Sequence, residues 1–433
     1  MSIRSEYRYY DVYPRIVRAG QETTITIKPL FDHCRLQDGK NYLLTLLPLE
    51  GMAGQMRRRV APTCPFELVD GALTFACHFE REQEYALLLV VDEGPGKKQK
   101  LIAEFRLYAL NDDLYARRPF KGDLHMHSAR SDGRESPAYV AGACRRIGLD
   151  FMAVTDHHLY TPSWQAIRAF EQVDIDLRIY PGEEVHPPDN PVHIINFGGN
   201  FSVNDLFAAE SYLDEVAQIE RELDDLDGID RYPYASCVWC FDKIREGGGL
   251  AVFCHPYWLS RHRYDVPTDL VDLILERQPY DALELIGGYW LHEVESNTLQ
   301  VARYHEERAH GKVIPVVGVS DAHGCERGLL GWYYTVVLAP SSDLVDLVDS
   351  VKGLYSVAVE ALPGDPPRAF GPFRLVKYTQ FLFREVFPQH DELCVQEGRL
   401  MLAHVAGNPH ARQMLHLLRG RTQMLYDHLW GAG

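Results

Sequence analysis

The sequence predicts an α/β protein in three parts: a small β domain, a barrel of alternating strands and helices, and a helical tail. Short β-rich segments follow one another over residues 1–115 with no helical pattern between them. Over residues 119–360, apolar segments alternate instead with segments of helical periodicity. Histidine and carboxylate side chains gather at the ends of those apolar segments, where a β/α barrel presents its chemistry.

Residues 1–115 are predicted to form a β-sandwich-like domain. Its strands are expected over residues 23–30, 41–49, 72–79, 85–92 and 100–110. Turn-forming clusters such as "LEGMAG" and "DEGPGKKQK" separate them, and several short strands without intervening helices are typical of a sandwich. His33 and His78 are isolated in this segment, so we expect the domain to pack against the barrel or to shape its mouth.

Residues 119–360 are predicted to form the barrel. Its first helix should begin with Ser136 as the N-cap and Pro137 at the first helical position. Continuous apolar segments such as "FMAVTD", "RIYPGEEV" and "GLAVFCHP" are typical of parallel strands that are buried on both faces. Residues 201–235 interrupt the alternation with an acidic amphipathic helix. We interpret them as a surface insertion, or as a lid if the apolar face meets the barrel mouth.

Residues 361–433 are predicted to form a helical C-terminal extension. Two amphipathic segments lie here, and Asn408 and Pro409 are a typical start for the second. The extension is either a packing appendage or a dimer surface, so a homo-oligomer is one of the two alternatives. Cys237 and Cys240 form a lone C-x-x-C pattern with no second pair nearby, and we expect them to be structural residues on a helix.

Composition excludes several classes of protein. The net charge of −17 argues against nucleic acid as a partner, because binding a polyanion requires a basic surface. A small-molecule anionic substrate remains compatible, since bound metal ions would supply positive charge locally. No apolar segment approaches the length of a membrane span, and the charged first twenty residues do not resemble a signal peptide. Nine cysteines at irregular spacing do not indicate a disulfide framework, so we expect a cytoplasmic protein.

Nine residues form a candidate metal site. Six histidines and three carboxylates lie at or near the predicted strand ends: His125, His127, Asp132, His157, Glu184, His193, His255, Asp321 and His323. A single zinc ion is satisfied by about four ligands. Nine ligands therefore suggest two or three ions that share carboxylates and a bridging water. His125 and His127 are two residues apart on an extended segment, so their side chains face the same side.

These motifs resemble those of the PHP family (polymerase and histidinol phosphatase domain). "DLHMHSARSDG" is similar to the first family motif, "TDHH" to the second and "PGEEVH" to the third. "FCHP" and "SDAHG" are similar to the last two, and the order is preserved over roughly residues 119–340. The resemblance implies a distorted (β/α)7 barrel and a trinuclear metal centre.

The resemblance also implies how the ligands are shared. One ion would be held by His125, His127, Glu184 and Asp321. A second would be held by Glu184 as a bridging ligand, with His193 and His255, and a third by Asp132, His157 and His323. The family's spacing from Gly182 favours Glu184 over Glu183 as the ligand, and strand alternation turns Glu183 to the other face, so Glu183→Gln should be mild. Zinc, manganese and iron all accept such nitrogen and oxygen ligands, so the identity of the metal stays open.

The predicted function is that of a metal-dependent hydrolase, most specifically a phosphoesterase that uses a metal-bridging hydroxide on a small soluble phosphate ester. His158 and His262 are the candidate catalytic residues beside the metals. Arg261 and Arg263, which follow His255, are the candidate phosphate-binding residues. Other basic residues compete for that role: Arg130, Arg134 and Arg327. Asp156 is expected to orient a ligand imidazole.

Two alternatives remain open from the sequence. The same trinuclear site would also serve a carbamate, ester or amide hydrolase, and basic residues around the metals would distinguish the two chemistries. The other alternative is a non-catalytic metal-binding adaptor. The complete set of ligands argues against it, because a site that had lost its activity would be expected to lose ligands as well.

Overall fold

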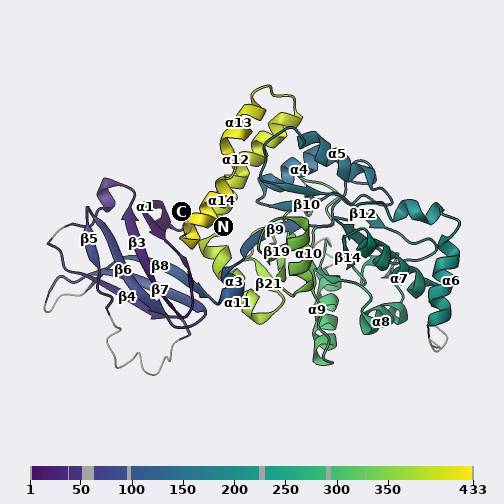
Figure 1. The fold of residues 1–433 in the computed structure, drawn as a ribbon, viewed down its shortest axis with the longest axis horizontal. Helices are drawn as coiled ribbons and strands as arrows, with labels where there is room; N and C mark the ends of the chain where they lie inside the picture. Colours follow the sequence, from purple (N-terminus) through teal and green to yellow (C-terminus); the bar gives the residue numbers. More distant parts are fainter. Residues whose placement is uncertain are drawn as a thin grey trace. The chain divides into compact units, whose positions relative to one another are not determined.

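The computed structural model describes residues 2–37, 39–50, 63–94, 99–223, 230–288, 294–326 and 328–431. The chain divides into two compact units (Figure 1). The first comprises Met1–Arg118, Lys377–Glu392 and Gly420–Gly433, and the second comprises Pro119–Val376 and Leu393–Arg419. The predicted α/β class is confirmed, since both strands and helices are abundant. None of the described helices is long and apolar enough to cross a membrane.

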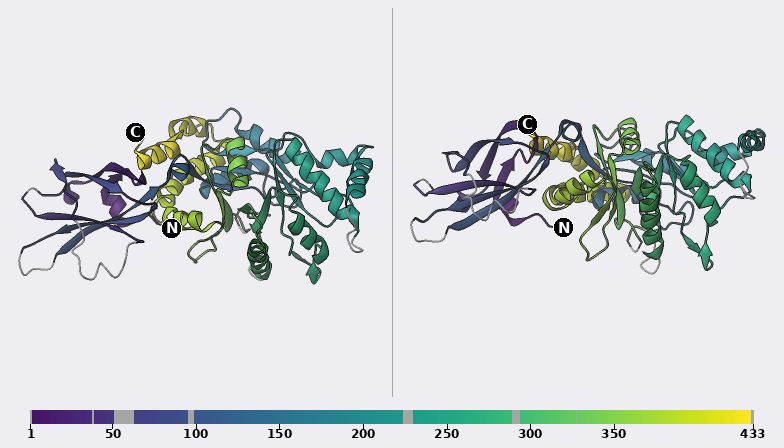
Figure 2. Two further views of the ribbon diagram at one scale, coloured as in Figure 1. Left: turned by 60° about the horizontal axis from the view of Figure 1, so that its bottom comes forward. Right: turned by 90° about the horizontal axis from the view of Figure 1, so that it is seen from below.

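The first unit contains two four-stranded sheets, drawn in purple and blue in Figure 2. One has the order β1 (Tyr10–Tyr13), β3 (Gln21–Pro29), β6 (Ala72–Phe79) and β5 (Glu67–Val69). The other has the order β2 (Ile16–Arg18), β8 (Lys100–Leu110), β7 (Gln83–Val91) and β4 (Tyr42–Pro48). Alternate residues of both sheets, among them Ile25, Phe75, Leu87 and Phe105, enter one shared hydrophobic core.

Helical segments complete the first unit: α1 (Ser5–Tyr9), η1 (Asp32–Cys34), α3 (Asp112–Tyr115), α14 (Arg421–Trp430), and parts of α11 (Phe373–Glu385) and α12 (Phe387–Val405). A buried arginine joins these segments to the strands. Arg15 Nη1 donates to the Glu385 carbonyl at 2.8 Å, and its Nη2 donates to Gln389 Oε1 at 2.7 Å. Residues from the last part of the chain are therefore integral to the first unit, because they satisfy a buried guanidinium.

The second unit contains two larger sheets where the sequence predicts a single barrel. One has the order β11 (Arg178–Tyr180), β10 (Phe151–Ala153), β9 (Arg118–Asp123), β19 (Tyr333–Ala339), β20 (Ser356–Glu360) and β21 (Arg368–Phe370). The other has the order β12 (Gly182–Val185), β13 (Ile194–Phe197), β14 (Leu250–Phe253), β17 (Ala282–Ile286) and β18 (Val316–Gly318). No closed barrel is found among the described strands; isolated bridges between His157 and Glu184, and between Met126 and Ala322, link the two sheets.

Two further expectations for these strands are corrected by the structure. The segment "RIYPGEEV" is not one strand, because it divides at Pro181 into β11 and β12, which belong to different sheets. Proline lacks the N–H that a central strand requires, which explains the break. The sheets are also not uniformly parallel, since β13 runs antiparallel to both β12 and β14.

Helices accompany these strands: α4 (Pro137–Arg146), α5 (Thr161–Phe170), α6 (Tyr212–Glu222), α7 (Arg231–Glu246), α8 (Thr268–Arg277), α9 (Val294–Ala309), α10 (Leu344–Lys352) and α13 (Ala411–Leu418). Two short elements, η2 (Asn204–Ala208) and the hairpin of β15 (Leu259–Ser260) and β16 (Arg263–Tyr264), lie in the connections. The predicted start of α4 is confirmed: Ser136 is the N-cap, its side chain accepts from the Tyr139 N–H, and Pro137 is the first helical residue.

The acidic insertion packs on its neighbouring helix. Tyr212 of α6 lies edge-on to Trp239 of α7, with ring centroids 4.9 Å apart, and Trp239 Nε1 donates to Glu215 at 2.8 Å. The two helices lie side by side (Figures 1 and 2). The apolar face of α6 is therefore used against α7, as expected of a surface insertion. Residues 224–229 of the insertion lie outside the described residues.

Candidate metal centre

Eight of the nine predicted ligands lie in or beside strands of the two sheets of the second unit, and Asp132 lies in the connection between β9 and α4. His125 and His127 follow β9, His157 follows β10, His255 follows β14, and Asp321 and His323 follow β18, while Glu184 lies within β12. His193 precedes its strand, β13. Because β13 is antiparallel to β14, with Ile194 opposite Phe253, the start of β13 lies at the same edge as the end of β14.

Glu184 lies at the centre of the candidate ligands. Its side chain is fully buried, and neither carboxylate oxygen has a hydrogen-bond partner. Oε1 lies 2.7 Å from His193 Nδ1 and 3.5 Å from His255 Nε2. Oε2 faces a different set, at 3.6 Å from His125 Nε2, 3.5 Å from His127 Nε2 and 2.5 Å from His157 Nδ1. Each oxygen of this carboxylate therefore has its own group of imidazoles.

Asp321 lies beside the two histidines that follow β9. Its Oδ1 is 2.9 Å from His127 Nε2 and 3.3 Å from His125 Nε2. The Asp321 N–H also donates to the His125 carbonyl at 2.9 Å, which fixes the loop after β18 against the end of β9. The carboxylates of Asp321 and Glu184 therefore both reach His125 and His127.

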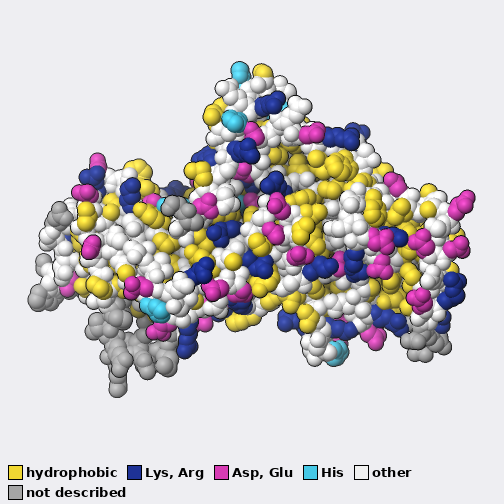
Figure 3. Space-filling model, viewed as in Figure 1, with side chains coloured by type: hydrophobic (Ala, Val, Ile, Leu, Met, Phe, Trp, Pro, Cys, Tyr) yellow, Lys and Arg dark blue, Asp and Glu magenta, His cyan; other side chains and the backbone are white. Residues whose placement is uncertain are grey.

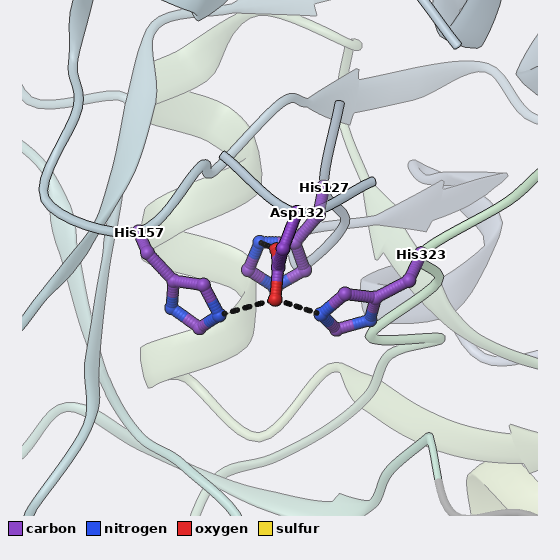
Figure 4. Close-up of side chains that lie close together, drawn as sticks. All are labelled: His127, Asp132, His157 and His323. Atoms are coloured by element: carbon purple, nitrogen blue, oxygen red, sulfur yellow. Dashed lines mark ion pairs between the residues drawn. The ribbon is translucent and has the colours of Figure 1, made fainter. Parts of the chain in front are cut away.

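Asp132 forms a second concentration of ligands with three histidines (Figure 4). Its Oδ2 lies 3.4 Å from His157 Nε2 and 3.2 Å from His323 Nε2. Its Oδ1 lies 3.7 Å from His127 Nδ1, and the rings of His127 and His323 stack with centroids 4.2 Å apart. One ligand atom from each of these four residues lies within 4.8 Å of the others, which is close enough for one ion.

The polar atoms of this cluster fit divalent cations. Several are buried without a hydrogen-bond partner, namely His125 Nε2, His127 Nδ1, His193 Nδ1 and both oxygens of Glu184. Buried polar atoms are normally satisfied, so a group of acceptors facing one another indicates a missing positive charge. The donor set is imidazole nitrogen and carboxylate oxygen, which suits zinc, manganese and iron.

The electrostatics of the cluster support the same conclusion. Burial raises the pKa of Glu184, but the neighbouring His193 and His125 lower it by more, so its pKa lies well below the ordinary value. Burial lowers the pKa of His125, while Asp321 and Glu184 raise it to a net value well above the ordinary one. These opposite shifts of Glu184 and His125 have one cause, the attraction between a buried carboxylate and a positive charge beside it. A proton supplies that charge in part, and a metal ion supplies it fully.

Glu183 faces the opposite side of β12, as alternation predicts. Its carboxylate is also fully buried, but it accepts hydrogen bonds from Asn196 Nδ2 (3.1 Å), Ser202 Oγ (2.8 Å), the Val203 N–H (2.5 Å) and Asn204 Nδ2 (2.9 Å). The expectation that Glu183→Gln is mild is therefore corrected. An amide would place its own donor group against buried donors, which is costly.

Asp156 does not orient an imidazole. Its carboxylate accepts from Ser128, through N (2.9 Å) and Oγ (2.7 Å), and from Ser131, through N (3.0 Å) and Oγ (2.5 Å). The interpretation of Asp156 as the partner of a histidine ligand is thus wrong. The residue instead fixes the loop that leads to Asp132, and this loop passes closely over His127, because a Cβ at Gly133 would lie 2.5 Å from the His127 carbonyl oxygen.

Three residues of the site were not predicted from the sequence. Glu284, in β17, accepts from His125 Nδ1 at 3.1 Å, so the Nε2 of that ring is left as a lone pair for a metal. Trp258 is partly exposed, and its ring lies 5.9 Å from that of His255 and 6.2 Å from that of His193. His186 lies among His157, Glu184 and His193. The sequence does carry a signal for His186, because it lies two residues after Glu184 and so faces the same side of an extended segment. No such signal marks Glu284.

The predicted catalytic and substrate residues lie at the edge of this cluster or beyond it. His158 is exposed, and its ring centroid is 4.3 Å from that of His186. Arg261 and His262, with φ of 49° and 71°, are the two central residues of the β15–β16 hairpin turn, and Arg263 opens β16. All three side chains are exposed, and among the described residues they form no ion pair or hydrogen bond with a candidate ligand.

The rival arginines differ in their surroundings. Arg130 Nε donates to Gln165 at 2.8 Å, so its guanidinium is already engaged. Arg134 is exposed and lies against Gly324, next to His323, because its Cδ is 3.1 Å from the position of a Cβ at Gly324. Arg327 lies outside the described residues. Arg134, Arg261 and Arg263 thus lie near ligands in the sequence, and within the described chain their guanidinium groups have no hydrogen bond that would compete with a substrate.

Comparison with known proteins gives one local sequence match. DNA polymerase/3'-5' exonuclease PolX of Bacillus subtilis is 44% identical over 82 residues, which make up 19% of this chain and 14% of PolX. The match therefore spans only a small part of that curated relative. No protein-family model matches the chain.

Solved structures are similar at a lower level. A two-domain protein of Bacteroides vulgatus containing a predicted PHP-like metal-dependent phosphoesterase is 16% identical, with a TM-score of 0.39 that covers 62% of this chain and 70% of that chain. Endonuclease Q, in complex with a 27-mer duplex substrate with an abasic lesion, is 13% identical, with a TM-score of 0.32. The similarity covers 55% of this chain and 57% of that chain. The ordered ligand motifs converge around Glu184, and together with the local identity to PolX they support the resemblance of this chain to PHP-domain proteins.

Proposed function

We propose that the chain is a metal-dependent phosphoesterase that acts on a small soluble phosphate ester. The observation that carries the proposal is the surroundings of Glu184. Its two buried oxygens lack hydrogen-bond donors and face separate groups of imidazoles, as expected of a carboxylate that bridges two cations. A purely structural carboxylate would be expected to have donors around it.

Three ions are proposed, with the ligands divided as the family resemblance implies. Glu184 and Asp321 with His125 and His127 would hold the first ion. Glu184, His193 and His255 would hold the second, and Asp132, His157 and His323 would hold the third. We further propose that the two sheets of the second unit correspond to the distorted (β/α)7 barrel of the family. The two sheets of the first unit would form the predicted β-sandwich. The proposed boundaries remain 1–115, 119–360 and 361–433.

The residues of the chain contribute in three ways. His125 is oriented by Glu284, which keeps its Nε2 directed toward Glu184 and Asp321. When bound, divalent ions would supply Lewis-acid charge and make a coordinated water acidic enough to react near neutral pH. His158, exposed beside the cluster, is proposed to protonate the leaving group, with His262 as the alternative acid from the hairpin. Arg261, Arg263 and Arg134 are proposed to bind the non-bridging oxygens of the phosphate.

The proposal is tested by metal analysis and a substrate panel. We expect more than one transition-metal ion per chain, and release of phosphate from monoesters that stops on chelation and returns on adding metal. Arg261→Ala or Arg263→Ala should lower kcat/KM for phosphate esters about ten- to a hundred-fold while all metals stay bound, since a charge-assisted contact contributes about 1.5–3 kcal/mol. Arg35→Ala, in the first unit, is the matched control for loss of an exposed arginine.

The panel also distinguishes the alternatives. Among the described residues, the exposed side chains of the hairpin turn around Arg261 form no hydrogen bond or ion pair with a candidate ligand, which is the observation that keeps carbamate, ester or amide hydrolysis as the second candidate. Cleavage of an aryl carbamate without any phosphate release would establish it, and no turnover with full metal occupancy would favour an adaptor. Oligonucleotides are included in the substrate panel to test nucleic acid as the alternative substrate. The net charge of −17 and the mixed acidic and basic side chains on the face drawn in Figure 3 support a small anionic substrate instead.

A further inference from the structure

His186 lies on the ligand face of β12, two residues after Glu184. Side chains of an extended segment alternate between its faces, so residues 184 and 186 point to the same side, as His125 and His127 do. The backbone holds this arrangement, because the His186 N–H donates to Asn204 Oδ1 at 3.2 Å and the Asn204 Nδ2 donates to the Glu184 carbonyl at 3.0 Å. Asn204 thus anchors the strand on both sides of Val185.

The His186 imidazole is enclosed by three candidate ligands. Its Nε2 is 3.0 Å from His157 Nδ1 and 3.6 Å from Glu184 Oε2. Its ring stacks on that of His193, with centroids 3.9 Å apart and planes inclined by 29°. The side chain is 17% exposed, so it lies within the cluster and still reaches its open side.

The ion that Glu184, His193 and His255 would share has room for another protein ligand. Three side chains are assigned to it, whereas zinc takes four or five ligands and the other metals of this class take up to six. The His186 ring stacks on one of those three ligands, His193, and its Nε2 faces Oε2 of Glu184, the oxygen that also lies 2.5 Å from His157 Nδ1. The neighbouring His158 makes neither contact among the described residues: its ring lies beside that of His186 on the exposed side.

We propose that His186 is a tenth ligand of the metal centre, binding through Nε2 an ion that Glu184 also holds. The proposal rests on the metal dependence proposed above. The competing explanation is that His186 only accepts a hydrogen bond from His157 Nδ1 and positions that ring. The two explanations differ in whether the side chain at position 186 touches the ion, and this can be measured without any substrate.

The first experiment measures metal binding. Parent protein, His186→Gln and the matched control His158→Gln are equilibrated with Zn²⁺ at buffered free concentrations, and bound metal is counted per folded chain. We expect His186→Gln to bind one ion at least tenfold more weakly, as loss of even an indirect partner costs 10–100-fold in affinity. His158→Gln should match the parent. Equal affinities for the parent and His186→Gln would overturn the proposal.

The second experiment asks whether the side chain contacts the ion. His186→Cys is loaded with Co²⁺ and compared with the parent loaded in the same way, because a thiolate bound to cobalt adds a charge-transfer absorption in the near ultraviolet. A new band in the variant supports direct ligation. Cobalt content equal to the parent with no new band would overturn it and establish the positioning role.

Two controls keep the outcomes separate. Thermal unfolding in chelator compares the metal-free forms, so a variant that is misfolded is recognised before its metal content is interpreted. If His186→Gln does not fold, the absorption of His186→Cys still decides the question. If the parent itself binds no metal, the proposed hydrolase function fails, whereas metal-replete parent with unchanged His186 variants overturns the tenth ligand alone.

Discussion

The two faces of β12 carry the same side chain, a fully buried glutamate, in opposite surroundings. On one face, Glu183 accepts four hydrogen bonds, one from Asn196 of β13 and three that tie the 202–204 connection to the strand. On the other face, both oxygens of Glu184 lack donors and lie among imidazole nitrogens. Burial by itself therefore does not distinguish a structural carboxylate from a metal-binding one. The distinction comes from what surrounds the oxygens, hydrogen-bond donors or lone pairs.

The largest effect is expected for Glu184→Gln. An amide oxygen is a weaker ligand, and the amide nitrogen cannot bind a cation, so a bridging site between two ions is lost. We expect loss of at least one metal ion per chain and a fall in hydrolase activity of about 1,000-fold or more, equivalent to about 4 kcal/mol. Metal analysis and phosphate release measure both. Full metal content in the variant would show that Glu184 is not the bridging ligand.

The proposed difference in role between Glu183 and Glu184 would be contradicted if Glu183→Gln lost metal as Glu184→Gln is expected to. We expect the opposite: metals stay bound per folded chain, and the free energy of unfolding falls by about 2–4 kcal/mol, because buried donors lose a charged acceptor and meet an amide N–H₂. Urea denaturation of the metal-free proteins measures this difference. A variant as stable as the parent would mean that the hydrogen bonds of Glu183 contribute nothing net.

Glu284→Gln tests a carboxylate that acts on the metals through a histidine. Its partner, His125 Nδ1, would lose a charged acceptor at 3.1 Å, which reduces the basicity of the ring and its fixed orientation. We expect metal affinity to fall about 10–100-fold with the fold retained. Glu307→Gln is a suitable control, since Glu307 is also buried but pairs with Arg303 at 2.8 Å. Equal affinity in both variants would remove Glu284 from the metal centre.

The smallest effect is expected for Asn204→Ala, because Asn204 forms hydrogen bonds with both Glu183 and Glu184. Asn204 Nδ2 donates to Glu183 Oε2 at 2.9 Å and to the Glu184 carbonyl at 3.0 Å. Its loss should lower the free energy of unfolding by about 1–2 kcal/mol and leave the metal content unchanged. Denaturation curves and metal analysis on the same preparation would check both expectations. Loss of metal would show that the position of β12, and not only its side chains, holds the ions.

Much of the site follows from local sequence. The His-x-His pair, the "TDHH", "FCHP" and "SDAHG" motifs and the position of Glu184 all depend on strand ends and on alternation, which act over a few residues. Those nine residues do come together in one cluster. The start of α4 was predictable for the same reason, because the cap and the proline act within one turn.

The arrangement of the strands was less predictable. Apolar segments indicate burial but not direction, so the antiparallel course of β13 between β12 and β14 was not predicted. The pairing of strands also decides whether a sheet closes, and here two isolated bridges join the sheets where one continuous barrel was expected. Pairing depends on contacts between segments that are distant along the chain, which periodicity does not report.

The sequence by itself determined which histidine and carboxylate side chains gather at the candidate metal centre, since their types and their places at strand ends are local properties. Only the tertiary structure decided the partners of Glu183, Asp156 and Glu284. Glu284 meets His125 across 159 residues, and Asp156 meets Ser128 across 28. A carboxylate takes its role from the donors or cations that the fold brings to it, and those come from elsewhere in the chain.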